Sequence, residues 1–144
     1  MTAFLNLLDE REQRSLLEKA RPRTYAPGES LITEGDREVR LLLVRSGSAR
    51  VVKNHLGLGV PFSRVVAGEV LGELAFVDGH PASASVIADT AMEVDVLDGA
   101  DVERLLAQDP ALAARVHRAM AITLAGRLRQ ANRGRSSLPV LGIG

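Results

Sequence analysis

The segment with the clearest potential for chemistry runs from residue 68 to residue 90, between two stretches of strand character. Within it, Gly72 and Glu73 are followed by Leu74 and Ala75, so a glycine opens a short run of helix formers. A strand that turns into a helix in this way directs free backbone N–H groups at one spot, which suits an anion such as phosphate. A buried glutamate beside that spot suits a sugar hydroxyl, because a carboxylate only accepts hydrogen bonds.

Few side chains are arranged for catalysis or for metal binding. The chain has no cysteine, which excludes a thiolate zinc site and a cysteine nucleophile. Its three histidines, His55, His80 and His117, lie far apart and lack the spacing of metal ligands. Gly57 and Gly59 are more typical of a loop tip than of a nucleotide cradle. We therefore expect a binding module without enzymatic activity, bound metal or cofactor.

Composition indicates a single globular domain. The 144 residues are 46% hydrophobic and 25% charged, a balance that supports one core. No segment has the pattern of a signal peptide or a bilayer-spanning helix, so we expect a cytoplasmic protein.

The charges are unevenly distributed along the chain. The net charge is zero, but residues 54–109 hold two arginines and ten acids, whereas residues 110–144 hold six arginines and no acid. An acidic middle and a basic end can attract each other within or between chains.

Residues 22–99 are expected to form many short strands. Runs of valine, isoleucine and leucine alternate there with turn pairs such as Pro27-Gly28 and Asp78-Gly79. This pattern favours a small all-β barrel or sandwich. The predicted strands are Leu31–Thr33, Val39–Arg45, Ala49–Lys53, Phe62–Val66, Ala84–Ala88 and Met92–Leu97.

Helical periodicity flanks this region on both sides. The first segment predicts a helix with Asp9 as its N-cap and Glu12 three residues later, ended by Pro22. Residues 101–109 predict a short helix, and residues 110–132 predict a long one before Gly134.

The long helix carries an apolar stripe that one small barrel is expected to leave partly uncovered. We therefore expect a homodimer through residues 110–132, and a flexible tail at residues 135–144. The stripe consists of Leu112, Val116, Met120, Leu124 and Leu128.

Taken together, these features resemble the cyclic nucleotide-binding domain family, best known from the catabolite activator protein and the regulatory subunits of cAMP-dependent kinase. The resemblance extends from Leu5 to about Arg129. It implies a mainly β fold, an eight-stranded, jelly-roll-like β-roll with an N-terminal helix, a short phosphate-binding helix and two C-terminal helices, all within residues 1–134. Its landmarks are Pro27-Gly28-Glu29, Glu34-Gly35-Asp36, Val44-Arg45-Ser46-Gly47, Gly68-Glu69, Gly72-Glu73-Leu74-Ala75 and Pro81.

The resemblance also implies a ligand pocket. Gly72 and Glu73 match the family's glycine and its ribose-binding glutamate. Leu74 and Ala75 match positions whose backbone N–H groups face the cyclic phosphate, and Ser83 matches a small or hydroxyl residue beside that phosphate.

Position 82 departs from the family pattern, because the arginine that pairs with the phosphate is replaced by Ala82. A hydrogen bond to a charged group contributes about 1.5–3 kcal/mol, so losing this pair is expected to weaken binding by about 10- to 1000-fold. We therefore expect binding of cAMP or cGMP to be weak, altered or lost. Arg50, Arg64 and His80 are candidate substitute charges, although His80 fits an exposed turn better than a ligand role.

The last helix departs from the family as well. In the family's transcription regulators, hydroxyls on this helix reach the base across the dimer, and those positions fall here on Arg127 and Leu128. Thr123, one turn earlier, is the nearest hydroxyl. We expect Arg127 to lie at the solvated end of a basic helix.

Three functions stay open at this point. The leading one is a non-catalytic regulatory domain with a degenerate pocket; the others are a genuine cAMP or cGMP receptor that tolerates Ala82, and a ligandless docking domain of a larger transporter, channel or regulator. Binding to nucleic acid is not expected, because about ten residues after Gly134 cannot form a helix-turn-helix domain. The low aromatic content of 3% also provides no stacking platform.

Overall fold

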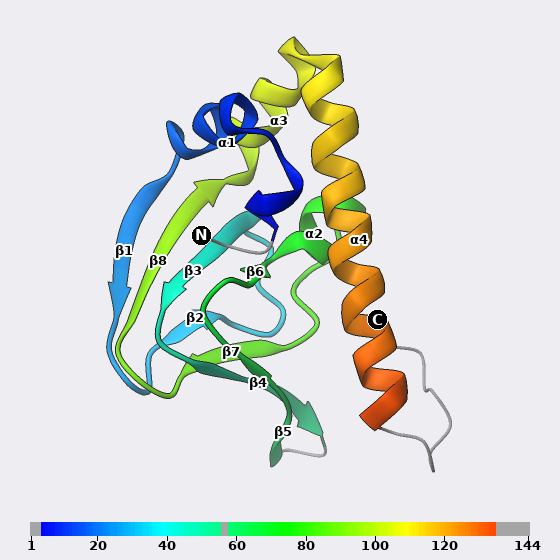
Figure 1. The fold of residues 1–144 in the computed structure, drawn as a ribbon. Helices are drawn as coiled ribbons and strands as arrows, with labels where there is room; N and C mark the ends of the chain where they lie inside the picture. The colour runs from blue at the N-terminus through cyan, green and yellow to red at the C-terminus, as the bar shows by residue number, and fades with distance from the viewer. Residues whose placement is uncertain (1–3, 56–57, 135–144) are drawn as a thin grey trace.

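In the part of the chain that the structure describes, eight strands and their flanking helices follow one another in the predicted order (Figure 1). The computed structural model describes residues 4–55 and 58–134, so the expected tail and Gly57 lie outside the described residues. The strands are β1 (Arg21–Tyr25), β2 (Ser30–Ile32), β3 (Arg40–Ser46), β4 (Ala49–His55), β5 (Leu58–Val65), β6 (Val70–Leu71), β7 (Ser85–Ala88) and β8 (Met92–Asp98). The helices are η1 (Leu5–Leu7), α1 (Glu10–Leu17), α2 (Glu73–Asp78), α3 (Gly99–Gln108) and α4 (Pro110–Gly134).

Two four-stranded antiparallel sheets form the roll, with strand orders β1-β8-β3-β6 and β2-β7-β4-β5. Two strands have no counterpart among the strands predicted from the sequence: the two-residue β6, and β1, which is charged and contains Pro22. Strand β1 pairs with β8 at the edge of its sheet. Proline has no backbone N–H to donate. It is tolerated at an edge strand because the outer side of that strand has no neighbouring strand that would accept a hydrogen bond.

Strand β3 separates two hydrophobic cores. Leu41 and Leu43 pack into the core beneath the helices, whereas Leu42 and Val44 pack into the core inside the roll. This alternation is the period-2 pattern of a strand that is covered on both faces. The even-numbered side chains of β3 therefore point into the roll.

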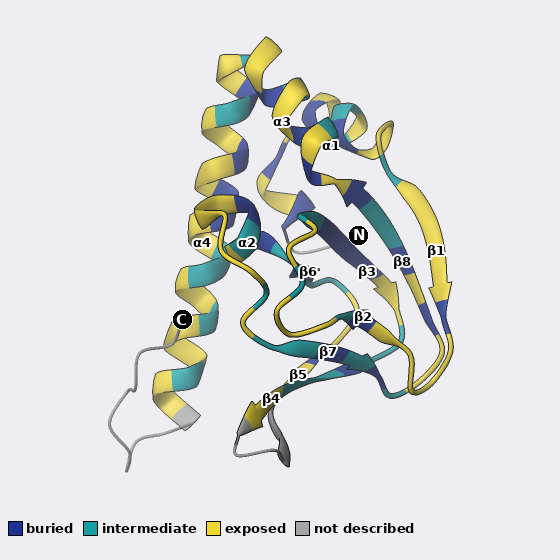
Figure 2. Cartoon of the chain, turned by 180° about the vertical axis from the view of Figure 1, so that it is seen from behind, coloured by how far each residue is buried: buried dark blue, intermediate teal, exposed yellow. Residues whose placement is uncertain are grey.

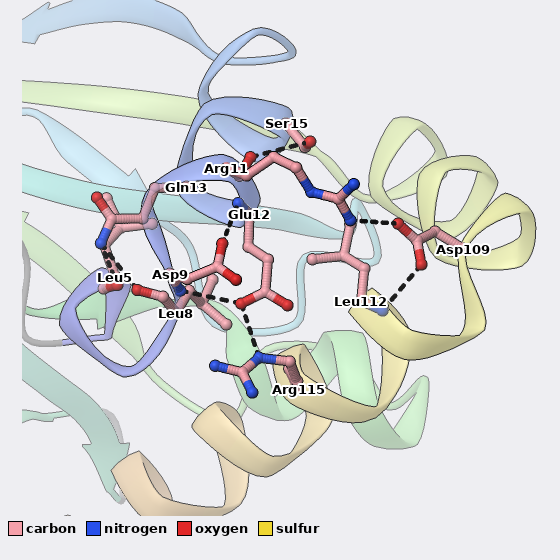
Figure 3. A network of polar contacts seen from close by, with 10 residues as sticks. All are labelled: Leu5, Leu8, Asp9, Arg11, Glu12, Gln13, Ser15, Asp109, Leu112 and Arg115. Carbon is pink, nitrogen blue, oxygen red and sulfur yellow. Dashed lines mark hydrogen bonds and ion pairs between the residues drawn. The ribbon is translucent and has the colours of Figure 1, made fainter.

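The N-terminal helix is capped as predicted and is tied to α4 (Figure 3). The Asp9 carboxylate accepts a hydrogen bond from the Glu12 amide at 2.8 Å, and the Glu12 carboxylate accepts from the Asp9 amide at 2.9 Å. Glu12 is 5% exposed and also accepts from the guanidinium of Arg115 on α4 at 2.7 Å. The capping box thus fixes the start of α1 and anchors the first half of α4.

The roll and its helices cover the first half of the α4 stripe. Leu112, Val116 and Met120 are buried within the chain, so the uncovered part of the stripe that the sequence predicts lies beyond Met120. Beyond Met120 the helix is mostly exposed or half-buried (Figure 2). Ile122 and Leu128 are each 44% exposed, and they form the apolar part of α4 that the chain itself does not cover.

Candidate functional site

The step from β6 into α2 depends on Gly72. Its φ of +85° lies in the left-handed region, which glycine adopts without steric cost. A Cβ at this position would lie 2.0 Å from the backbone oxygen of Arg40, so only a glycine lets the chain pass so close to β3. The helix that follows ends at Gly79, whose φ of +71° is also left-handed.

A cavity of about 150 Å³ opens between α2, the inner face of the roll and α4. All six residues predicted from the sequence to form a ligand pocket line it. They come from the two ends of residues 72–83, which we call the cassette, so the fold brings both ends of the cassette into one concavity. Its lining includes Gly72, Glu73, Leu74, Ala75, Ala82 and Ser83 from the cassette, Arg40, Leu42, Val51 and Val86 from the roll, and Arg127 from α4.

The far end of the cassette is held against the loop that precedes β3. The Ala82 amide donates to the Asp36 carbonyl oxygen at 2.9 Å, and the Gly35 amide donates to the Ala82 carbonyl oxygen at 2.8 Å. Two backbone hydrogen bonds therefore fix position 82 at the cavity wall. The methyl side chain of Ala82 leaves open the space that a longer side chain would fill.

Glu73 is the buried acid of the cavity, with an exposed fraction of 3%. Burial raises the pKa of its carboxyl group, while Arg127 and the residue's own backbone amide lower it and the nearby Glu69 raises it. One carboxylate oxygen accepts from Arg127, and the other is buried with no hydrogen-bond partner among the described residues. A buried acceptor without a partner is costly, so this oxygen is suited to a hydroxyl donated by a ligand.

Arg127 reaches the cavity from α4, and the expectation of a solvated helix end is wrong. Its guanidinium donates to the Glu73 carboxylate and to the Val70 carbonyl oxygen, and it lies 3.9 Å from the Glu69 carboxylate. The sequence did contain a signal for this position, because Arg127 follows the buried Met120 by seven residues. Two helical turns bring a side chain back to the same face of a helix.

Arg40 is the second guanidinium at the cavity, and the sequence analysis did not single it out. It donates to the Leu31 carbonyl oxygen at 3.0 Å, which joins β3 of one sheet to β2 of the other. The available signal was the alternation along β3, because Arg40 shares its phase with the inward-facing Leu42 and Val44.

The substitute charges proposed from the sequence lie elsewhere. Arg50 and Arg64 both pair with Asp89 near the end of β7, and neither lines the cavity. His80 is exposed just after α2. The Thr123 hydroxyl donates to the Ala119 carbonyl oxygen of its own helix at 2.9 Å, so it is used within α4.

The cavity therefore combines an apolar wall, one buried acceptor and two arginines. Such a set can bind a ligand that offers a hydroxyl to Glu73 and a hydrogen-bond acceptor to an arginine. A metal site is not formed: among residues 4–55 and 58–134, no three side chains that could bind a metal ion come together. None of the described helices is long and apolar enough to cross a bilayer.

Comparisons with known proteins agree with this architecture. A profile of the cyclic nucleotide-binding domain matches residues 22–109. Glutaminase 1 of Bradyrhizobium diazoefficiens is 36% identical over 110 residues, which are 76% of this chain and 17% of that protein. The cAMP-dependent protein kinase regulatory subunit of Aspergillus niger is 37% identical over 82 residues, which are 57% of this chain and 20% of that protein.

Solved structures show the same likeness. A cyclic nucleotide-binding domain from Methylobacillus flagellatus KT superimposes with a TM-score of 0.84 at 29% identity, covering 93% of this chain and 77% of that one. The chain spans a fifth or less of the length of the two curated relatives above.

Proposed function

Since the chain belongs to the cyclic nucleotide-binding domain family, we propose that it is a non-catalytic regulatory domain that binds cAMP or cGMP with reduced affinity. One observation carries this proposal: Glu73, at the ligand cavity, is paired with Arg127 of α4. The residue that would receive the ligand's sugar thus also contacts the helix that would report its presence.

The unpartnered oxygen of Glu73 supports a sugar-bearing ligand. A ribose hydroxyl can donate to this buried acceptor, and the apolar wall of Leu42, Val51 and Val86 can cover a base. The short side chain of Ala82 removes the charged clamp that the family uses for the phosphate, so affinity is expected to be lower than in a complete pocket.

Binding is expected to change the position of α4. A hydroxyl that donates to the unpartnered oxygen of Glu73 shares the carboxylate with Arg127 and so weakens the ion pair that links the second half of α4 to the cassette. The ligand then shifts the helix between an attached and a released state, to the extent that its affinity for the two states differs.

Calorimetry with cAMP and cGMP tests the proposal. We expect the wild type to bind with a Kd above about 10 μM, and Ala82→Arg to bind at least tenfold more tightly. Glu73→Gln is expected to weaken binding in both backgrounds, because an amide replaces part of the acceptor. Tight binding by the wild type would instead identify a receptor that tolerates Ala82. No heat from either protein would contradict the proposal and favour a docking domain.

The proposed role includes no catalysis. The match to glutaminase 1 covers 17% of that enzyme, and the exposed His80, after α2, and His117, on α4, lie in separate parts of this chain. The purified chain is therefore expected to show no glutaminase turnover.

We propose that the domain works in the cytoplasm.

We also propose that a second copy of the chain covers the exposed apolar part of α4, made of Ile122 and Leu128. Each is 44% exposed, and packing α4 against its two-fold copy is an economical way to bury apolar side chains of both copies at once. Light scattering is expected to give a dimer mass for the wild type and a monomer mass for Ile122→Glu/Leu128→Glu. Equal masses for the two proteins would exclude this interface.

A further inference from the structure

Arg40 is a charged side chain at an inward-facing position of the roll. It has the same phase on β3 as Leu42 and Val44, which are both fully buried in the inner core. Its own side chain is 15% exposed. Arginine is seldom buried among apolar side chains unless its N–H donors have acceptors. The acceptors of the Arg40 donors are therefore informative.

The contacts of Arg40 leave one buried nitrogen, Nε, without a hydrogen-bond acceptor among the described residues. One terminal nitrogen donates to the Leu31 carbonyl oxygen at 3.0 Å. The Asp36 and Glu38 carboxylates lie 3.8 and 3.7 Å from the guanidinium, beyond normal hydrogen-bond length. Glu38 is 65% exposed, so an anion bound inside the cavity can displace this loose contact at small cost.

Arg40 also lies beside both ends of the cassette. Its backbone oxygen is the atom that a Cβ on Gly72 would meet, and the Asp36 carbonyl oxygen accepts from the Ala82 amide. The Arg40 guanidinium lies 3.8 Å from the carboxylate of the same Asp36, and Arg40 and Ala82 line the same cavity. The other cavity arginine, Arg127, is engaged with Glu73 and Val70.

We propose that Arg40 supplies the charge that position 82 lacks, and that it donates to the anionic group of a ligand whose sugar hydroxyl is accepted by Glu73. The anion clamp has thus moved from the cassette to the facing strand β3. This inference rests on the function proposed above and specifies which residue recognises the ligand's phosphate.

The test compares a charged and a neutral ligand of similar shape, cAMP and adenosine, on four proteins: the wild type, Arg40→Met, Arg37→Met as an exposed neighbouring control, and Arg40→Met/Ala82→Arg. We expect Arg40→Met to weaken cAMP binding by about 10- to 100-fold, as for the loss of a hydrogen bond to a charged group, and to leave adenosine binding unchanged. Arg37→Met is expected to bind both ligands as the wild type does. The double variant is expected to regain cAMP binding.

A second measurement uses the unmodified protein and so does not depend on the folding of a variant. The Nε–Hε resonance of Arg40 is expected to shift in a ¹⁵N NMR titration with cAMP and to stay in place with adenosine. Suppose that the wild type binds both ligands. Equal cAMP affinity of Arg40→Met and the wild type, or an Arg40 resonance that does not respond to cAMP, would then overturn the role of Arg40 but not the proposed function. If the wild type binds neither ligand, the proposed function fails together with this inference.

Discussion

The Glu73 carboxylate and the Arg127 guanidinium form an ion pair across 54 residues of sequence, at the wall of the cavity. Glu73 begins the cassette helix α2, and Arg127 belongs to the second half of α4, which the roll leaves mostly exposed (Figure 2). The first half of α4 has other anchors, namely its buried apolar residues and the pair between Glu12 and Arg115. The Glu73–Arg127 pair, together with the hydrogen bond from Arg127 to the Val70 carbonyl oxygen, is thus positioned to hold the second half of α4.

Arg127→Met is expected to release the second half of α4 without unfolding the first. The exposed fraction of the Arg127 side chain is 31%, so the cost to the free energy of unfolding lies below that of a fully buried pair, at about 1–3 kcal/mol. Hydrogen exchange should accelerate in residues 121–134 and stay slow around Val116.

The matched control for this variant is Arg129→Met, because Arg129 is an exposed arginine on the same helix. Its effect on stability should stay within about 0.5 kcal/mol, as for most surface changes. Equal exchange rates in the two variants would show that the ion pair does not hold the helix.

The buried carboxyl of Glu73 predicts a pH dependence of stability. Burial raises the pKa of Glu73 above its ordinary value of 4.5, against the lowering effect of Arg127. When the folded-state pKa lies above the unfolded one, folding favours the protonated form, so the stabilisation is complete below pH 4.5 and is lost as the pH rises through the folded-state pKa.

Urea titrations of the wild type and Glu73→Gln measure this effect. We expect the free energy of unfolding of the wild type to decrease relative to that of Glu73→Gln as the pH is raised through this window, because glutamine does not titrate. A difference that stays constant across the window would contradict the buried, titrating carboxyl.

The cassette was predictable from sequence because its features are local. A glycine with helix formers behind it marks the turn between β6 and α2, and turn residues mark most strand ends. The period-2 and helical patterns likewise placed most of the elements. Strand β1 was missed because its edge position, which makes Pro22 acceptable, is a property of the assembled sheet.

The two arginines of the cavity were harder to predict. Periodicity indicates that Arg127 shares a face with Met120, but the approach of that face to Glu73 depends on how α4 lies against the roll. Arg40 has the phase of inward-facing residues, yet its charge favoured a solvent position at the start of a strand. In both cases the site arises from tertiary contacts between segments that local patterns describe separately.

The first half of α4 is expected to belong to the core of the domain. Met120 is 1% exposed, so Met120→Ala should lower the free energy of unfolding by about 2–5 kcal/mol, through the lost burial and the cavity that is left. Val77→Ala, at a residue that is 55% exposed, should change it by less than about 0.5 kcal/mol. Urea denaturation compares the two. A small effect at Met120 would mean that this part of α4 does not pack on its own chain.

The close approach of Gly72 to β3 predicts unequal effects at the two ends of α2. Gly72 and Gly79 both have left-handed φ values, so alanine should cost about 1–2 kcal/mol at each for conformation alone. A Cβ at Gly79 meets nothing within 4 Å, whereas at Gly72 it lies 2.0 Å from the Arg40 backbone oxygen. Gly72→Ala should therefore be the more destabilising in urea denaturation and should shift the backbone NMR resonances of β3, which Gly79→Ala leaves in place. Equal costs at the two positions, with β3 undisturbed, would show that the cassette does not pack against this strand as described.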